Sequence, residues 1–132
     1  MDKKYLKKII AKSPDDLQFI SACCHQAKVK VSDMKYLPKN KIFIMSLERY
    51  NRETEEKKSK INSIIKFEFV ESIKSKKIDQ NNPDLILELL AIDIFKKNFK
   101  YEIFLDFSNK KIMILNVEVL DINMDDEILI ND

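Results

Sequence analysis

The side chains with the most reactive chemistry stand in a row, as Cys23, Cys24 and His25. Cysteine and histidine are preferred zinc ligands, and a Cys–His pair can also make a thiol nucleophile. Neighbouring residues of a helix point about 100° apart, however, and no CxxC or HxxxH elsewhere in the sequence supplies further ligands. Both cysteines lie on the apolar side of a predicted helix, so we interpret them as core thiols and His25 as solvated. We expect no metal and no cofactor.

A second candidate is an ion pair between two predicted strands. Strand alternation puts Asp33 on the same face as Val31, and it puts Arg49 on the same face as Leu47. A partly buried Asp33–Arg49 pair would mainly serve structure, because losing one partner would leave a buried charge. Two alternatives stay open at this point: a turn or bulge at Ser32 that exposes Asp33, or a role in ligand binding.

A third candidate is a basic rim formed where successive predicted strands end. Such a rim attracts phosphate groups or acidic partners. Tyr50 is its only aromatic residue, whereas proteins that bind single strands usually present several stacking side chains. We therefore expect nucleic acid less than protein as the partner. The residues of the predicted rim are Arg49, Arg52, Lys74, Lys76 and Lys77.

Length and composition exclude several function classes. The chain has 132 residues, a net charge of +2 and no glycine. Dinucleotide and Walker-type loops need glycine where the backbone approaches phosphate, so we expect neither nucleotide-binding class. No apolar run approaches the roughly 18 residues that span a bilayer, and the N-terminus lacks the apolar core of a secretory signal. We expect one cytoplasmic domain over residues 1–132, with no membrane partner.

The charge is unevenly distributed along the chain. Residues 1–77 hold 19 Lys and Arg against 10 Asp and Glu, whereas residues 78–132 hold 5 against 12. Residues 51–60 have many charges and no apolar period, so we expect an exposed charged loop there. Residues 123–132 form a predicted acidic tail. Its Asp125, Asp126 and Glu127 lack the spacing and the glycine of a calcium loop.

The elements that position these residues follow from periodicity. Ser13, Pro14 and two acidic residues predict a helix start, and apolar spacing extends this helix over residues 14–28. Alternation then predicts about seven strands, at residues 5–11, 29–37, 41–50, 61–69, 84–95, 101–107 and 112–122. Residues 84–95 are apolar on both faces, so a helix is the alternative there, and we favour a strand. Short turns make neighbouring strands antiparallel. The predicted fold class is α+β: a bent, mostly antiparallel sheet covered by one N-terminal amphipathic helix, on a split-barrel or pleckstrin-homology-like plan.

Short motifs along the chain resemble, in order and nearly in register, a small alphaproteobacterial family known only as domain of unknown function 2948. The similar stretches lie within residues 16–122 and include Tyr36-Leu37-Pro38-Lys39, Leu47-Glu48-Arg49, Ser72-Ile73-Lys74-Ser75, Leu89-Leu90-Ala91-Ile92 and Leu115-Asn116-Val117-Glu118-Val119. The family tends to have tryptophan at Arg52 and glycine at Ser32, Lys77 and the Asn109-Lys110 turn, and it lacks the Cys-Cys-His motif. The resemblance implies a cytoplasmic single domain and no particular activity.

The function expected from these observations is a non-catalytic protein-interaction or assembly module with an unknown protein partner. A homodimer formed by pairing exposed sheet edges is a further expectation. Two alternatives are retained: binding of nucleic acid or a phosphate ligand through the basic rim, and an enzyme of unrecognised type. Salt-dependent binding would distinguish the first of these.

Overall fold

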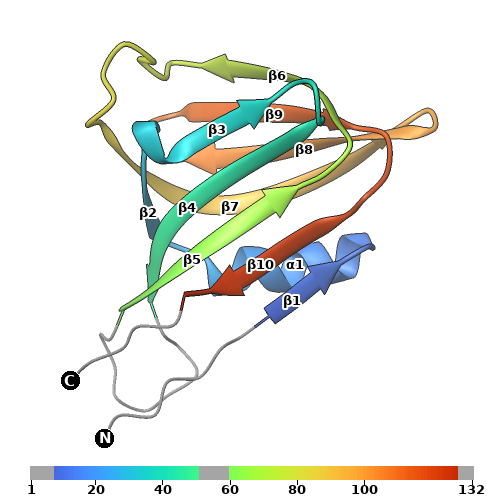
Figure 1. The fold of residues 1–132 in the computed structure, drawn as a ribbon, viewed down its shortest axis with the longest axis horizontal. Helices are drawn as coiled ribbons and strands as arrows, with labels where there is room; N and C mark the ends of the chain where they lie inside the picture. Colours follow the sequence, from blue (N-terminus) through green and yellow to red (C-terminus); the bar gives the residue numbers. More distant parts are fainter. Residues whose placement is uncertain (1–7, 51–59, 128–132) are drawn as a thin grey trace, which may run out of the picture.

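In the computed structural model, residues 8–50 and 60–127 are described; they form one sheet of ten strands, all paired antiparallel, and one α-helix (Figure 1). The elements are β1 (Lys8–Ala11), α1 (Pro14–Cys23), β2 (Ala27–Lys30), the 3-10 turn η1 (Val31–Asp33), β3 (Met34–Leu37), β4 (Ile42–Tyr50), β5 (Lys60–Phe67), β6 (Val70–Lys76), β7 (Ile86–Lys97), β8 (Lys100–Phe107), β9 (Lys111–Val117) and β10 (Ile122–Asp126). The strand order is β1-β10-β5-β4-β2-β7-β8-β9-β6, and β3 pairs with the first half of β4.

The fold is therefore mostly β, and the predicted α+β class with about seven strands is wrong. Three extra strands account for the difference. The predicted strand at 29–37 is split by η1 into β2 and β3, the predicted acidic tail contains β10, and residues 70–76 form the edge strand β6. The helix has 10 residues instead of the 15 expected for residues 14–28. The predicted loop at 51–60 lies outside the described residues apart from Lys60, where β5 begins.

The helix begins where its sequence predicts and ends early for a visible reason. Ser13 is the N-cap, and its hydroxyl accepts a hydrogen bond from the Asp16 amide at 3.2 Å. After Cys23 the chain turns through Gln26, which has a φ of 68°. The Gln26 amide donates to the Leu89 carbonyl at 2.7 Å, and this bond leads the chain into β2 beside β7.

The helix is held on β7 at an irregularity of that strand. The pairing of β7 with β8 shifts between Leu89 and Ala91, which leaves backbone groups there outside the regular ladder. The Ser21 hydroxyl accepts from the Ile92 amide at 2.8 Å, and Nδ1 of His25 lies 2.9 Å from the Leu90 carbonyl. Side chains of α1 and of the turn that follows it thus bond to the backbone groups that the bulge exposes.

The sheet curls until its two halves face each other, with β1, β10, β5 and β4 on one side and β7, β8, β9 and β6 on the other (Figure 1). The chain crosses between the halves at the corner between β5 and β6, where Phe69 has a φ of 59°. Beyond this corner, the Val70 amide donates to the Lys41 carbonyl at 2.8 Å and the Tyr36 hydroxyl donates to the Val70 carbonyl at 2.8 Å. These two bonds tie one end of β6 to the β3–β4 hairpin.

The core lies between the two halves and under α1. It contains alternate residues of the central strands, such as Met45, Ile65, Leu105 and Leu115, together with Leu17 of the helix. Each alternates with exposed or half-buried neighbours, as expected for strands with one face in a core. Among the described residues, no helix has the length and apolar character to cross a membrane.

Because the chain has no glycine, other residues occupy its left-handed turn positions. Lys77, Asn109 and Lys110 have φ values of 64°, 63° and 62°. A non-glycine residue in this conformation costs about 1 kcal/mol, so these turns keep their shape at some expense in stability.

Candidate functional site

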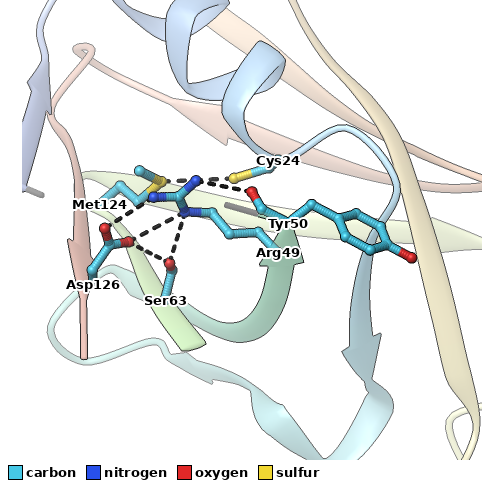
Figure 2. A network of polar contacts seen from close by, with 6 residues as sticks. All are labelled: Cys24, Arg49, Tyr50, Ser63, Met124 and Asp126. Carbon is cyan, nitrogen blue, oxygen red and sulfur yellow. Dashed lines mark hydrogen bonds and ion pairs between the residues drawn. The ribbon is translucent and has the colours of Figure 1, made fainter. Parts of the chain in front are cut away.

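A buried polar network sits at one end of the core, where β4, β5 and β10 meet (Figure 2). The guanidinium of Arg49 donates from Nη2 to Oδ2 of Asp126 at 2.9 Å and from Nε to Oδ1 at 3.2 Å. Ser63 lies between them and donates its hydroxyl to Oδ1 of Asp126 at 2.6 Å. Arg49 and Ser63 are 0% exposed and Asp126 is 3% exposed. The network is a two-bond, fork-shaped ion pair enclosed by the core.

The partner predicted for Arg49 is therefore wrong. Asp33 lies in η1 and is exposed, on the rim of a shallow polar depression of about 450 Å³ that Lys28, Lys30 and Glu48 also line. The reason is the turn η1, which interrupts the strand at Ser32 and ends the alternation that placed Asp33 beside Val31. Exposure of Asp33 by a turn was one of the alternatives left open.

The predicted basic rim is divided by the fold. Lys74 and Lys76 are exposed on β6, and Lys77 follows them in a left-handed turn. Arg49 is buried near the end of β4, which lies at the opposite end of the molecule from β6 (Figure 1). Arg52 lies outside the described residues. The structure keeps the three lysines together on β6 and the turn that follows it, and it separates Arg49 from them.

The Cys-Cys-His motif is part of the helix packing. Cys23 and Cys24 are buried free thiols, as the interpretation of core thiols requires. The Cys24 thiol lies 3.7 Å from the Met124 sulfur, on the helix side of the Arg49 network (Figure 2). His25 is exposed and contacts the β7 bulge through Nδ1. In residues 8–50 and 60–127, no three His, Cys, Asp or Glu side chains are grouped so that they could hold a metal ion.

An apolar groove of about 430 Å³ lies between β3 and β6. Its walls come from β3, β4, β6 and β9, and one end is bounded by the segment that follows β6. Two polar side chains, of Ser32 and Gln80, border an otherwise mainly apolar lining. The apolar lining consists of Val31, Met34, Tyr36, Phe43, Ile73, Ile78, Pro83 and Met113.

The two strands that flank the groove each have a free edge. Among the described residues, β3 pairs only with β4, and β6 pairs only with β9. The Tyr36–Val70 hydrogen bond joins the two strands at one end of the groove. At the other end, Gln80 donates to the Ser75 hydroxyl at 2.8 Å and fixes the segment after β6. The groove is an apolar slot between two unpaired strand edges.

Two aspartates, Asp93 and Asp106, lie next to each other on the outer face of the β7–β8 pair. Asp93 is paired with Phe104, and Asp106 is paired with Ala91, so both carboxyl groups lie on one face in adjacent rows. Burial, and then hydrogen bonding and repulsion from Asp93, raise the pKa of Asp106 to about 6. At neutral pH the pair therefore holds two close negative charges.

This raised pKa gives a pH-dependent stability. The pKa of Asp106 is about 6 in the folded chain and near the ordinary 3.8 when unfolded, so the folded state binds more protons between these values. Stability from this group is present below about pH 4 and is lost as the pH rises through 6. Replacing Asp106 with asparagine should therefore raise the urea midpoint at neutral pH and leave it unchanged at about pH 3.5.

The measurement is a set of urea unfolding curves across this range, with the exposed Asp84→Asn as the matched control. The difference between wild type and the Asp106 variant should grow as the pH rises. A difference that stays constant with pH, or a variant that is less stable than wild type at neutral pH, would contradict the expectation.

The partner of Arg49, Asp126 in β10, could have been identified as a core-facing residue from the alternation of apolar residues along that strand. Ile122, Met124 and Asp126 are all buried and occupy alternate positions. The same two-residue period that identifies strands would have placed Asp126 on the core face, opposite Ser63. The free edges and the shared face of Asp93 and Asp106, by contrast, depend on which strands pair, and no local pattern specifies that.

A protein-family model described as "Protein of unknown function (DUF2948)" matches residues 7–128. No curated protein and no solved structure matches the chain. The match includes all ten strands, α1 and each residue of the Arg49 network. It confirms the resemblance that the short sequence motifs indicate, and the chain belongs to this family of proteins of unknown function.

Proposed function

We propose that the domain is a non-catalytic protein-interaction module that binds an extended segment of a partner protein in the groove between β3 and β6. The observation that carries the proposal is the apolar groove, open between two strands that each lack a second partner among the described residues. The proposed location is the cytoplasm, and two free cysteines agree with a reducing compartment.

The free edges supply the main-chain part of the binding. An unpaired strand edge presents amide and carbonyl groups that can pair with an added strand, and this mode of recognition recurs in peptide-binding domains. β3 has 4 residues and β6 has 7, so the flanking edges accept a short segment. The Tyr36–Val70 bond limits the segment at one end. A segment of about four to six residues fits this length.

The apolar lining supplies the side-chain part. Alternate side chains of an added strand point to one face, so one or two of them enter the groove between Met34 and Ile73. Each large apolar side chain buried there contributes about 1.5–3 kcal/mol before the cost of ordering the peptide. The proposed ligand is therefore an extended segment with a large apolar residue at alternate positions and no proline.

The alternative function is binding of a phosphate ligand or nucleic acid, for which Lys74 and Lys76 on β6 and Lys77 directly after it remain available. Arg49 cannot contribute to this binding, because it is enclosed with Asp126 and cannot reach a ligand at the surface. The polar side chains of the Arg49 network bond to one another, which favours a structural role for them over a catalytic one. The groove is thus a better-supported site than the rim.

The experiment is a selection of displayed random peptides on the full chain, with counter-selection on an Ile73→Lys variant. Ile73 lines the groove, whereas Lys74 is on the opposite face of the same strand, so Lys74→Ser is the matched control. Selected peptides should carry alternate large apolar residues, bind the control normally and bind Ile73→Lys at least about tenfold more weakly. Circular dichroism and thermal unfolding establish that both variants are folded.

Hydrogen exchange of the bound complex locates the peptide. The backbone amides of β6 or β3 that lack a partner strand should become protected, because an added strand pairs with them. A selection that yields no peptide sensitive to Ile73→Lys, or protection that appears only on other strands, would overturn the proposal.

A further inference from the structure

The outer face of β6, β9, β8 and β7 carries a regular order of side chains across the sheet. Residues that are directly paired in an antiparallel sheet share a face, so the registers define rows. Read from β6 to β7, one row is Lys74, Ile114, Phe104 and Asp93. The next row begins with Lys76, Ile112 and Asp106. Each row has a cation at one end, apolar residues at its centre and a carboxylate toward the other end.

Within residues 8–50 and 60–127, the charged ends of these rows have no partner of opposite charge. None of Lys74, Lys76, Asp93 and Asp106 forms an ion pair with another described residue. Lys76 and Asp106 are two strands apart, and the strand spacing of about 4.8 Å separates them by roughly 10 Å. Across this separation the two side chains do not form an ion pair in the structure.

The centre of the face is apolar and accessible. Ile112, Ile114 and Phe104 are half-buried, and Phe95 is 53% exposed with its ring edge-on to Phe104 at 5.1 Å between centroids. Among the described residues, the helix packs against the other side of the sheet, where its buried side chains join the core. An apolar centre with opposite charges on its two sides is a surface that can complement itself.

A two-fold operation brings the opposite charges together. With the axis in the plane of contact, parallel to the strands and between β8 and β9, β6 of one copy lies over β7 of the other and β9 lies over β8. Lys74 then faces Asp93 of the second copy, Lys76 reaches the Asp93–Asp106 pair, and Ile114 packs on Phe104. An axis across the strands would instead place β6 on β6 and bring the lysines together. Charge selects the first arrangement.

We propose that the chain forms a symmetric dimer through this outer face, with Lys74 and Lys76 of each copy paired with Asp93 and Asp106 of the other. The dimer uses the face of the sheet, in contrast to the edge pairing expected from sequence. The four strands and two to three rows bury on the order of 400 Å² per copy, or about 800 Å² in total, which is the size of a weak, transient interface. The dimer is therefore weak and reversible.

Sedimentation velocity of the full chain, from about 10 µM to about 1 mM, tests this dimer. Wild type should dimerise within this range. The variants Lys74→Glu with Lys76→Glu, and Asp93→Lys with Asp106→Lys, should each dimerise at least about tenfold more weakly, because like charges then meet. An equimolar mixture of the two variants should form a heterodimer, because each contact again joins opposite charges. This recovery also shows that both variants are folded.

Three results would overturn the proposal: wild type that stays monomeric throughout the range, charge-reversed variants that dimerise as well as wild type, or a mixture that does not associate. An edge-paired dimer would survive the change of Asp93 and Asp106 to lysine, because neither residue lies on an edge strand. The groove variant Ile73→Lys should leave the dimer unchanged, since Ile73 points to the other side of β6. Failure of the dimer and failure of the groove proposal are thus separate results.

Discussion

Changing Asp126 to asparagine is expected to lower the free energy of unfolding by about 3–5 kcal/mol, because it leaves the Arg49 guanidinium charged and enclosed without its counter-ion. Arg49 is 0% exposed, so water cannot replace the lost carboxylate in the folded state. Two charge-assisted hydrogen bonds, at 2.9 and 3.2 Å, lose their charged acceptor in the same change. Urea unfolding at neutral pH, followed by far-ultraviolet circular dichroism, measures the effect.

The matched control is Asp33→Asn, which removes an exposed aspartate of the same charge and should change stability by less than about 0.5 kcal/mol. A double variant, Arg49→Met with Asp126→Leu, should recover much of the loss, because apolar residues of similar volume remove both buried charges together. A loss below about 1 kcal/mol in Asp126→Asn would show that Arg49 does not depend on this carboxylate.

Strand alternation predicted that Arg49 lies on a core face and needs a carboxylate, and this holds in the structure. The partner could not be found from the same rule, because alternation within a strand does not say whether Asp33 or Asp126 comes close to Arg49. The turn η1 removes Asp33 from the face, and the pairing of Asp126 with Ser63 in β10 and β5 supplies the acid. The choice depends on long-range strand pairing, which local periodicity does not contain.

The missed strands have physical reasons too. β6 has lysine at alternate positions and only Val70 fully buried, because one of its edges and its outer face are exposed. Such a strand has a weak apolar signal. β10 was not predicted as a strand because it contains acidic residues, although Ile122 and Met124 occupy alternate positions and are buried. In contrast, β8 and β9 have apolar residues at every second position, and each begins within one residue of its predicted start. β9 ends at Val117, five residues before the predicted end at residue 122.

The two proposed surfaces could not be predicted from the sequence for a related reason. Lys74 and Asp93 are 19 residues apart in the chain and lie in one row only because β6 pairs with β9, β9 with β8, and β8 with β7. The groove likewise forms where β6 and β3, which are not paired, come close at Tyr36 and Val70. Predicting either surface requires knowing the registers of three or more strand pairs together.

Changing Phe67 to alanine is expected to lower the free energy of unfolding by about 3–5 kcal/mol, because it leaves a cavity in the core. Phe67 is 0% exposed, is paired with both Phe43 and Ile122, and has its ring 5.9 Å from that of Phe43. The two neighbouring strands hold these residues in register, so they cannot collapse into the space. Urea unfolding and thermal unfolding measure the loss.

The same substitution at Phe99 is the matched control. Phe99 lies between β7 and β8 and is 94% exposed, so Phe99→Ala removes the same atoms from solvent and should change stability by less than about 0.5 kcal/mol. The contrast separates loss of packing from loss of an aromatic residue in itself. Equal effects of the two substitutions would mean that Phe67 is not held in a rigid core, and the register of β4, β5 and β10 would then need revision.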